Sequence, residues 1–228
     1  MLPTLAAPVK EVLPNRIQQR FHLWLDGFNP PEPNVSWWQK DYNNYYTDLV
    51  KNNPELPQLL EEEPNLQKSI NVDAWFDILA FQPAQATFGL ASGGTTGRGL
   101  GLGFVELIPV ADSDYIYAAI AEELGLLGGL LITFALITFV SAGVRTALDA
   151  RDIFSKLCAA GLTAFIGFQA LVNMGGITRA LPMTGITLPF VSHGGFSLIT
   201  SFVMLGMLLA FSHRNAIDAN VGLANSKQ

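Results

Sequence analysis

The second half of the chain contains three long apolar stretches, at 124–144, 157–178 and 188–211. None of them contains Asp, Glu, Lys or Arg. About 20 apolar residues are enough for a helix to cross the hydrocarbon core of a bilayer. A helix also satisfies its own backbone hydrogen bonds in lipid. The pattern therefore predicts an all-α, polytopic helical membrane protein with three transmembrane helices.

The first half is more polar and predicts short helices. Apolar residues recur at helical spacing over 14–28, which indicates an amphipathic helix. Residues 36–51 hold two Trp and three Tyr, which could form an aromatic belt at the lipid headgroups or the core of a small helical domain. Residues 61–63 are three glutamates and suggest a solvated loop. We expect 72–90 to form a short helix along the membrane, interrupted near Pro83.

Composition narrows the function classes. Half of the 228 residues are hydrophobic and only 14% are charged, against roughly 25% in typical soluble domains. The formal net charge of −6 comes mainly from acids in residues 1–114, so a nucleic-acid partner is not expected. The single cysteine excludes an internal disulfide.

The flanking cations predict the orientation of the spans. Arg145, Arg151 and Lys156 lie between the first and second spans, whereas Arg179 is the lone cation between the second and third. Because cytoplasmic loops are enriched in Lys and Arg, we expect a membrane domain at 115–214 and a cytoplasmic tail at 215–228. The segment 1–114, with its short helices and glycine-rich loop, should then face the outside.

The first ten residues lack the cationic start and sustained apolar core of a signal peptide. An acidic segment of more than a hundred residues must nevertheless be carried outward. We therefore expect this chain to be the C-terminal part of a larger polytopic protein.

A glycine-rich run occupies 92–103. It lacks the Gly-Lys-Ser/Thr of a Walker loop, and its spacing does not complete the dinucleotide-binding pattern. Two interpretations stay open: backbone N–H groups that approach an anion, or a tight turn between membrane elements.

Several charged residues lie at the predicted membrane boundary. Asp114 directly precedes the segment that leads into the first span, where it could cap a helix or act as a general base. Glu122 and Glu123 are expected to pair with a cation. Arg179 could snorkel to the interface or bind a phosphate. His193 has no second histidine nearby, so no metal site is expected.

The strongest motifs are 108–125, which includes Ile-Pro-Val-Ala-Asp-Ser-Asp-Tyr-Ile-Tyr and Ala-Glu-Glu-Leu-Gly, then 168–178 and 181–195. In order and spacing they resemble the FtsW/RodA/SpoVE family (the shape, elongation, division and sporulation proteins). The glycine-rich segment 85–101 is similar to the family's outer loop, and the resemblance covers about residues 80–214.

The resemblance implies a multi-pass protein of the bacterial cytoplasmic membrane that polymerises lipid II into peptidoglycan during cell division or cell-shape maintenance. It implies a class B penicillin-binding transpeptidase as partner, and no cofactor beyond a divalent cation that could assist. Asp114 is implied as the catalytic base. The substrate-binding residues implied or suggested by these motifs are Arg98, Arg179, Ser192, Gly194 and Gly195.

The chain also departs from the family pattern. His193 and Phe196 stand where the family usually has Tyr and Ser, and Asp112-Ser113 replaces His-Thr. Residues 30–80 resemble an insertion in the outer loop, and family members have more spans than these three. Two competing functions stay open: a lipid II flippase and a non-catalytic division scaffold.

Overall fold

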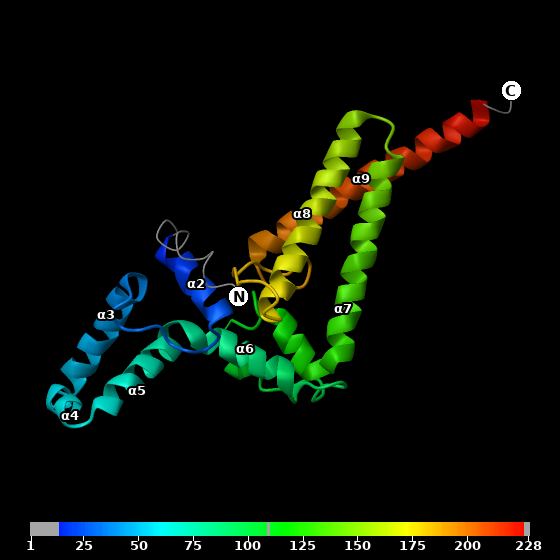
Figure 1. Cartoon of the computed structure of the whole chain (residues 1–228). Helices are drawn as coiled ribbons and strands as arrows, with labels where there is room; N and C mark the ends of the chain where they lie inside the picture. The colour runs from blue at the N-terminus through cyan, green and yellow to red at the C-terminus, as the bar shows by residue number, and fades with distance from the viewer. Residues whose placement is uncertain (1–13, 109, 226–228) are drawn as a thin grey trace. The chain divides into compact units, whose positions relative to one another are not determined.

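The computed structural model describes residues 14–108 and 110–225, and these contain helices and no strand (Figure 1). The expectation that the first ten residues are not a signal peptide lies outside the described residues. The all-α prediction is confirmed. The chain forms two compact units: one contains the described residues up to 85 together with 179–183, and the other contains 86–178 and the residues from 184 onward.

The first unit is built from short helices. They are α2 (Asn15–Leu25), α3 (Ser36–Asn52), α4 (Leu56–Glu62), α5 (Pro64–Trp75) and the π-helix η1 (Phe76–Ala80). Trp38, Ala74 and Trp75 are fully buried at its centre. The rings of Trp38 and Trp75 meet edge to face at 5.3 Å, a favourable geometry for aromatic pairs. The Trp38 indole N–H donates to Asn71 Oδ1 at 3.0 Å, so its polar atom is satisfied in the core.

This core decides between the two interpretations of the aromatic segment. Trp37, Trp38 and Tyr42 of α3 are buried against α5 and η1. Tyr45 and Tyr46 are partly buried against the same cluster. The aromatic residues of α3 therefore build a small helical core and do not form an exposed belt.

Two local predictions in this region were wrong. Residues 61 and 62 of the expected loop are instead the end of α4, and only Glu63 lies outside the helix; Glu61 and Glu63 are exposed. The expected break near Pro83 is absent, and the irregularity is η1 at 76–80. Pro83 lies in the first turn of α6 (Phe81–Ser92). α6 continues from η1 without a break, since Phe81 N donates to Phe76 O.

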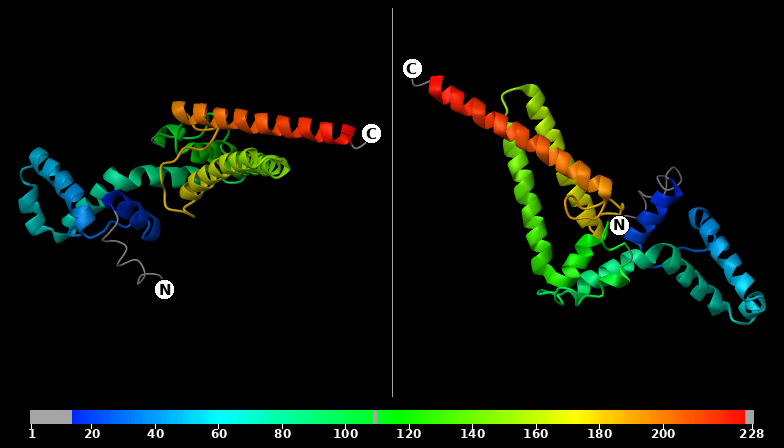
Figure 2. Two further views of the ribbon diagram at one scale, coloured as in Figure 1. Left: turned by 90° about the horizontal axis from the view of Figure 1, so that it is seen from above. Right: turned by 180° about the vertical axis from the view of Figure 1, so that it is seen from behind.

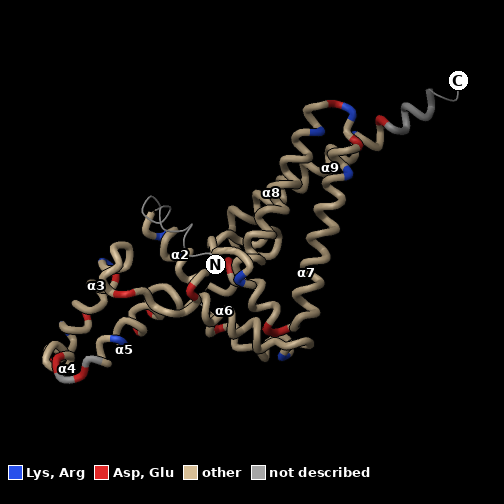
Figure 3. Tube along the Cα trace, viewed as in Figure 1, with Lys and Arg blue, Asp and Glu red and all other residues tan. Residues whose placement is uncertain are grey.

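The second unit contains the three predicted spans. They are α7 (Ile116–Asp149), α8 (Ile153–Ile177) and α9 (Gly195–Asn225). α7 packs mainly against α8, and α9 lies on one side of this pair (Figure 2). All three are long and apolar enough to cross a membrane. Figure 3 shows that their Lys, Arg, Asp and Glu residues gather toward the ends.

The connection between α7 and α8 is short because Asp152 caps α8. Its carboxylate accepts a hydrogen bond from Ser155 N at 2.9 Å. This bond lowers the pKa of Asp152, and the Arg214 guanidinium at 3.8 Å acts in the same direction. The chain reverses direction in this connection, and α7 and α8 pack as an antiparallel pair (Figure 1).

The third span begins later than predicted. The helix starts at Gly195, and the segment from Leu188 to Gly194 is not helical. Pro189 lacks an N–H, and Phe190 has a φ of 65° that a continuous right-handed helix excludes. At its other end α9 continues to Asn225, so residues 215–225 of the expected tail extend the helix.

The boundary between the two compact units falls between residues 85 and 86. The glycine-rich loop is the reason, since its backbone hydrogen-bonds to α7. Residues 86–114 thus pack with the apolar helices.

Candidate functional site

The candidate base Asp114 lies in the loop between the 3-10 helix η2 (Val105–Leu107) and α7. Three consecutive carbonyl oxygens of this loop are held from distant parts of the chain. The donors to residues 112, 113 and 114 are His193 N at 2.7 Å, Ser192 Oγ at 2.6 Å and Asn173 Nδ2 at 2.9 Å, respectively. The loop is therefore fixed by α8 and by the segment that precedes α9.

The Asp114 side chain itself is half-buried. It forms no hydrogen bond or ion pair with another described residue. The residue that caps α7 is Tyr115, and no side chain bonds to the free N–H groups there. The capping alternative for Asp114 is therefore not realised, and its carboxylate is available to a ligand.

Asn173 of α8 supports the loop from the membrane side. Its side chain is 4% exposed, and its amide donates to Asp114 O and to Ile186 O, the latter at 2.6 Å. Its Oδ1 atom has no hydrogen-bond partner among the described residues. Asn173 is not among the residues that the sequence motifs predicted for the site. A polar residue inside an apolar span was the signal that could have found it, because such residues usually pair or function.

Ser192 was expected to bind substrate, but its hydroxyl is fully engaged within the chain. It is 1% exposed, donates to Ser113 O, and accepts from Leu188 N at 2.7 Å. A Cβ added at Gly194 would lie 3.3 Å from Ser197 Cβ, which is a tight contact. A Cβ added at Gly195 would have no atom within 4 Å, so that position has room for a side chain. In this structure Ser192 positions the Asp114 loop.

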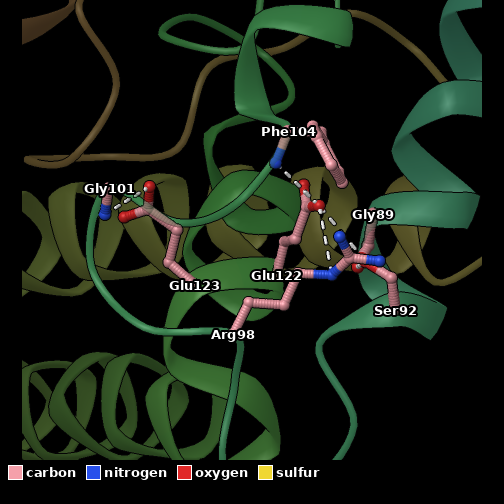
Figure 4. Close-up of polar contacts among 7 residues, drawn as sticks. All are labelled: Gly89, Ser92, Arg98, Gly101, Phe104, Glu122 and Glu123. Atoms are coloured by element: carbon pink, nitrogen blue, oxygen red, sulfur yellow. Dashed lines mark hydrogen bonds and ion pairs between the residues drawn. The ribbon is translucent and has the colours of Figure 1, made fainter.

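Glu122 forms a second polar cluster, at the glycine-rich loop (Figure 4). The carboxylate is 2% exposed and accepts from Phe104 N at 3.0 Å and from Ser92 Oγ at 3.3 Å. Arg98 Nε lies 3.9 Å from it, and the Arg98 guanidinium lies over the Phe104 ring at 4.9 Å. The expected pairing with a cation is confirmed for Glu122. Glu123 instead accepts from Gly101 N at 3.1 Å.

The glycine-rich loop fills a break in α7. Gly125 has φ 68° and ψ −164°, which interrupts the helix. The freed carbonyls of Glu122 and Glu123 accept from the backbone N–H groups of Arg98 and Gly99, at 3.0 and 2.9 Å. Leu126 N donates back to Gly94 O at 2.9 Å. The loop is therefore a tight turn against α7, and these two N–H groups are not available to an anion.

Arg98 and Arg179 were the expected ligands for a phosphate. Arg98 is 36% exposed, so part of its guanidinium remains accessible beside Glu122. Arg179 belongs to the first unit, where Nη2 donates to Leu23 O at 3.0 Å and the guanidinium lies 4.8 Å from the Phe28 ring. The Trp24 indole donates to Arg179 O at 3.0 Å. These contacts use the Arg179 guanidinium in the packing of α2.

No group of three or more His, Cys, Asp or Glu within the described part of the chain is arranged to hold a metal ion. A divalent cation as a cofactor thus has no preformed cage among these residues.

Comparison with known proteins identifies the family. The FtsW/RodA/SpoVE family of cell cycle proteins matches residues 71–217. The chain belongs to this family. The match includes the Asp114 loop, the glycine-rich loop and all three apolar helices, whereas most of the first unit lies before it.

Relatives of the FtsW/RodA/SpoVE family are similar over the same region. The chain is 40% identical over 150 residues to peptidoglycan glycosyltransferase RodA of Mycobacterium tuberculosis, which covers 63% of this chain and 32% of the relative. It is 37% identical over 145 residues to stage V sporulation protein E of Bacillus subtilis. The aligned region covers 62% of this chain and 40% of that relative. The chain thus spans about a third of the length of the curated RodA relatives it matches.

A solved structure described as "Structural coordination of polymerization and crosslinking by a peptidoglycan synthase complex" has a similar fold. The TM-score is 0.53 at 24% sequence identity, with 76% of this chain and 49% of that chain covered. This likeness supports the helical membrane architecture.

Proposed function

We propose that this chain carries the catalytic carboxylate of a peptidoglycan glycosyltransferase that polymerises lipid II. The observation that carries the proposal is the Asp114 loop: its backbone is held at three consecutive carbonyls, while its carboxylate has no partner among the described residues. A fixed backbone with a free carboxylate is the arrangement that general-base catalysis requires. The names of the relatives supply the reaction class.

In the proposed reaction the Asp114 carboxylate accepts the proton of the 4-hydroxyl of the acceptor sugar. The hydroxyl oxygen attacks the anomeric carbon of the donor sugar and forms the new glycosidic bond. The bond from the anomeric carbon to the diphosphate breaks, and undecaprenyl diphosphate leaves with the electron pair. A cation near the departing diphosphate would stabilise the charge that develops there. Arg98, part of whose guanidinium is exposed, is the candidate within the second unit.

The proposed location is the bacterial cytoplasmic membrane, with residues 1–114 on the outer face and the C-terminus in the cytoplasm. The proposed partner is a class B penicillin-binding transpeptidase. Two observations support a partner: the similar solved structure belongs to a complex that joins polymerisation to crosslinking, and most of the first unit lies outside the family match as a helical domain with its own core.

The test compares Asp114→Asn with Asp112→Asn in the protein purified together with its transpeptidase. Both changes remove one carboxylate from the same loop, but Asp112 is exposed and contributes to the loop through its backbone carbonyl. Because general-base catalysis contributes about a hundredfold or more, Asp114→Asn should reduce glycan-strand formation from lipid II by at least that factor. Asp112→Asn should retain most of the activity.

The alternatives give different results. A scaffold would bind its partner but form no glycan in the wild-type protein. A flippase would move labelled lipid II across vesicles without forming polymer. Asp114→Asn protein that polymerises like the wild type would overturn the assignment of the base.

A further inference from the structure

A pocket of about 530 Å³ lies between α7 and α9, and the α7 residues that line it belong to the C-terminal end of that helix, whereas the Asp114 loop precedes its N-terminal end. The end of α7 supplies Arg145, Thr146 and Asp149 to its lining, and α9 supplies Ser212 and Asn215. Arg151, from the turn before α8, completes the polar lining.

The walls of the pocket are held together by hydrogen bonds. Asn215 Nδ2 of α9 donates to Thr146 O of α7 at 2.8 Å. The Thr146 hydroxyl donates to Ala142 O of its own helix at 3.0 Å. The bond from Asn215 joins the two helices at the pocket, so the pocket is part of the packed structure.

The charges in the pocket favour an anion. Arg145 and Arg151 form no ion pair or hydrogen bond with a described residue, although Asp149 also contributes a carboxylate to the lining. The nearby Arg214 differs, since it lies 3.8 Å from Asp152. Two guanidinium groups without partners can form paired hydrogen bonds with phosphate oxygens. The Ser212 hydroxyl, which has no partner among the described residues, adds a donor.

The surroundings favour a lipid as the source of that phosphate. Val144 and Leu148, next to Arg145 and Asp149 on α7, are exposed apolar side chains, and Leu209 is exposed one turn before Ser212 on α9. A ligand with a phosphate and acyl chains would cover both the polar pocket and these side chains. Basic pockets between membrane helices are known to recognise anionic lipid headgroups.

We propose that this pocket binds the phosphate diester of an anionic phospholipid and holds the ends of α7 and α9 together at the membrane surface. The proposal concerns a site separate from Asp114 and does not depend on the glycosyltransferase reaction.

The test measures retention of phosphatidylglycerol by the purified protein with native mass spectrometry. The comparison is phosphatidylcholine, which has the same phosphate diester but no net charge because it also carries a choline cation. We expect phosphatidylglycerol to be retained at least about tenfold better by the wild type, because the choline cation of phosphatidylcholine would lie close to the two guanidinium groups and be repelled by them. The Arg145→Gln/Arg151→Gln variant should lose this preference. The matched control, Lys156→Gln/Arg214→Gln, removes two cations from the same end of the unit but none from the pocket lining, and should keep it.

The other outcomes contradict the proposal. If both double variants lose the preference for phosphatidylglycerol equally, the lipid is attracted by the general positive charge of this surface and not by a specific site. Equal retention of the two lipids would exclude recognition of the anionic headgroup, and full competition by inorganic phosphate would indicate a free anion in place of a lipid. If the Arg→Gln variant unfolds, the Arg145→Lys/Arg151→Lys variant keeps the two positive charges but removes the guanidinium groups and their paired N–H donors. It should bind more weakly than the wild type, and unchanged binding would overturn the proposal.

Discussion

The side-chain amide of Asn173, in the second apolar helix, donates a hydrogen bond at 2.9 Å to the backbone carbonyl of Asp114, 59 residues earlier in the chain. The same amide bonds to Ile186 O at 2.6 Å. One buried side chain thus joins α8, the segment before α9 and the loop that carries the candidate base. Segments that are remote in sequence therefore hold the backbone of the loop that carries Asp114.

Replacing Asn173 with leucine should harm both stability and activity. The carbonyls of Asp114 and Ile186 would each lose a buried donor, and an unsatisfied buried polar group destabilises by about 1–3 kcal/mol. A displacement of the Asp114 loop of about 1 Å can reduce turnover about a hundredfold. The measurements are denaturant unfolding in detergent and the rate of glycan-strand formation.

Gln169→Leu is the matched control for this prediction. Gln169 is also on α8 and its amide bonds to Thr187 O at 2.9 Å, but it does not contact the Asp114 loop. It should lower stability while retaining most of the turnover. If the two variants lose the same amount of turnover at similar stability, the prediction that Asn173 positions the Asp114 loop is wrong.

Replacing Gly97 with alanine should displace the glycine-rich loop. Gly97 has a φ of 80°, and a Cβ there would collide with the backbone oxygen of Glu123. Gly94→Ala is the control, since Gly94 has a φ of 55° and a Cβ there would meet nothing within 4 Å. A left-handed conformation alone costs an alanine about 1–2 kcal/mol. Gly97→Ala should therefore lower the free energy of unfolding by more than this amount, because the collision adds to the cost.

The measurement for the glycine pair is the unfolding midpoint together with tryptic cleavage after Arg98. A displaced loop should expose Arg98 and speed cleavage in Gly97→Ala but not in Gly94→Ala. Similar cleavage rates in both variants would show that the packing against α7 does not hold the loop.

Removing the cation beside Glu122 should destabilise the second unit. Arg98→Gln leaves a carboxylate that is 3% exposed without a positive partner. We expect a loss of about 1–3 kcal/mol, toward the lower end because Arg98 is 36% exposed and water screens part of the attraction. Arg98→Lys should recover part of it.

A double-mutant cycle with Glu122→Gln isolates the Arg98 interaction. If the pair interacts, the loss in the double variant should be smaller than the sum of the two single losses. Additive losses in denaturant unfolding would mean that Arg98 and Glu122 do not stabilise one another.

The hydroxyl of Tyr45, in the first unit, should lose its proton at a higher pH than an ordinary tyrosine. Burial raises its pKa to about 12 from 10.0, and the hydrogen bond to Asp77, at 3.0 Å, adds to the effect. Because the folded pKa lies above the unfolded one, the stabilisation is present below pH 10.0 and is lost as the pH rises toward about 12. Tyr45→Phe should remove this part of the alkaline pH dependence of stability.

Ultraviolet titration of the phenolate provides the measurement for Tyr45. The absorbance change assigned to Tyr45 should move to lower pH in Asp77→Asn, because one acceptor charge beside the hydroxyl is lost. An unchanged titration in that variant would show that Asp77 does not act on Tyr45.

The sequence by itself determined the helical architecture and the family. Hydropathy and length are local properties, so three uncharged stretches were enough to predict three membrane helices. The motif around Asp114 and those at 168–178 and 181–195 were enough for the family, which the comparisons confirm. The pairing of Glu122 with a cation also followed from the need of a carboxylate near a span for a partner.

Only the tertiary structure decided how these parts meet. The sequence did not reveal that Ser192 bonds to Ser113, because the two residues lie 79 positions apart. Nor did it reveal that the glycine-rich loop enters a break at Gly125, or that α9 starts at Gly195. These features depend on the hydrogen bonds and packing that form between distant segments of the chain. Local sequence patterns do not encode which buried donor meets which carbonyl.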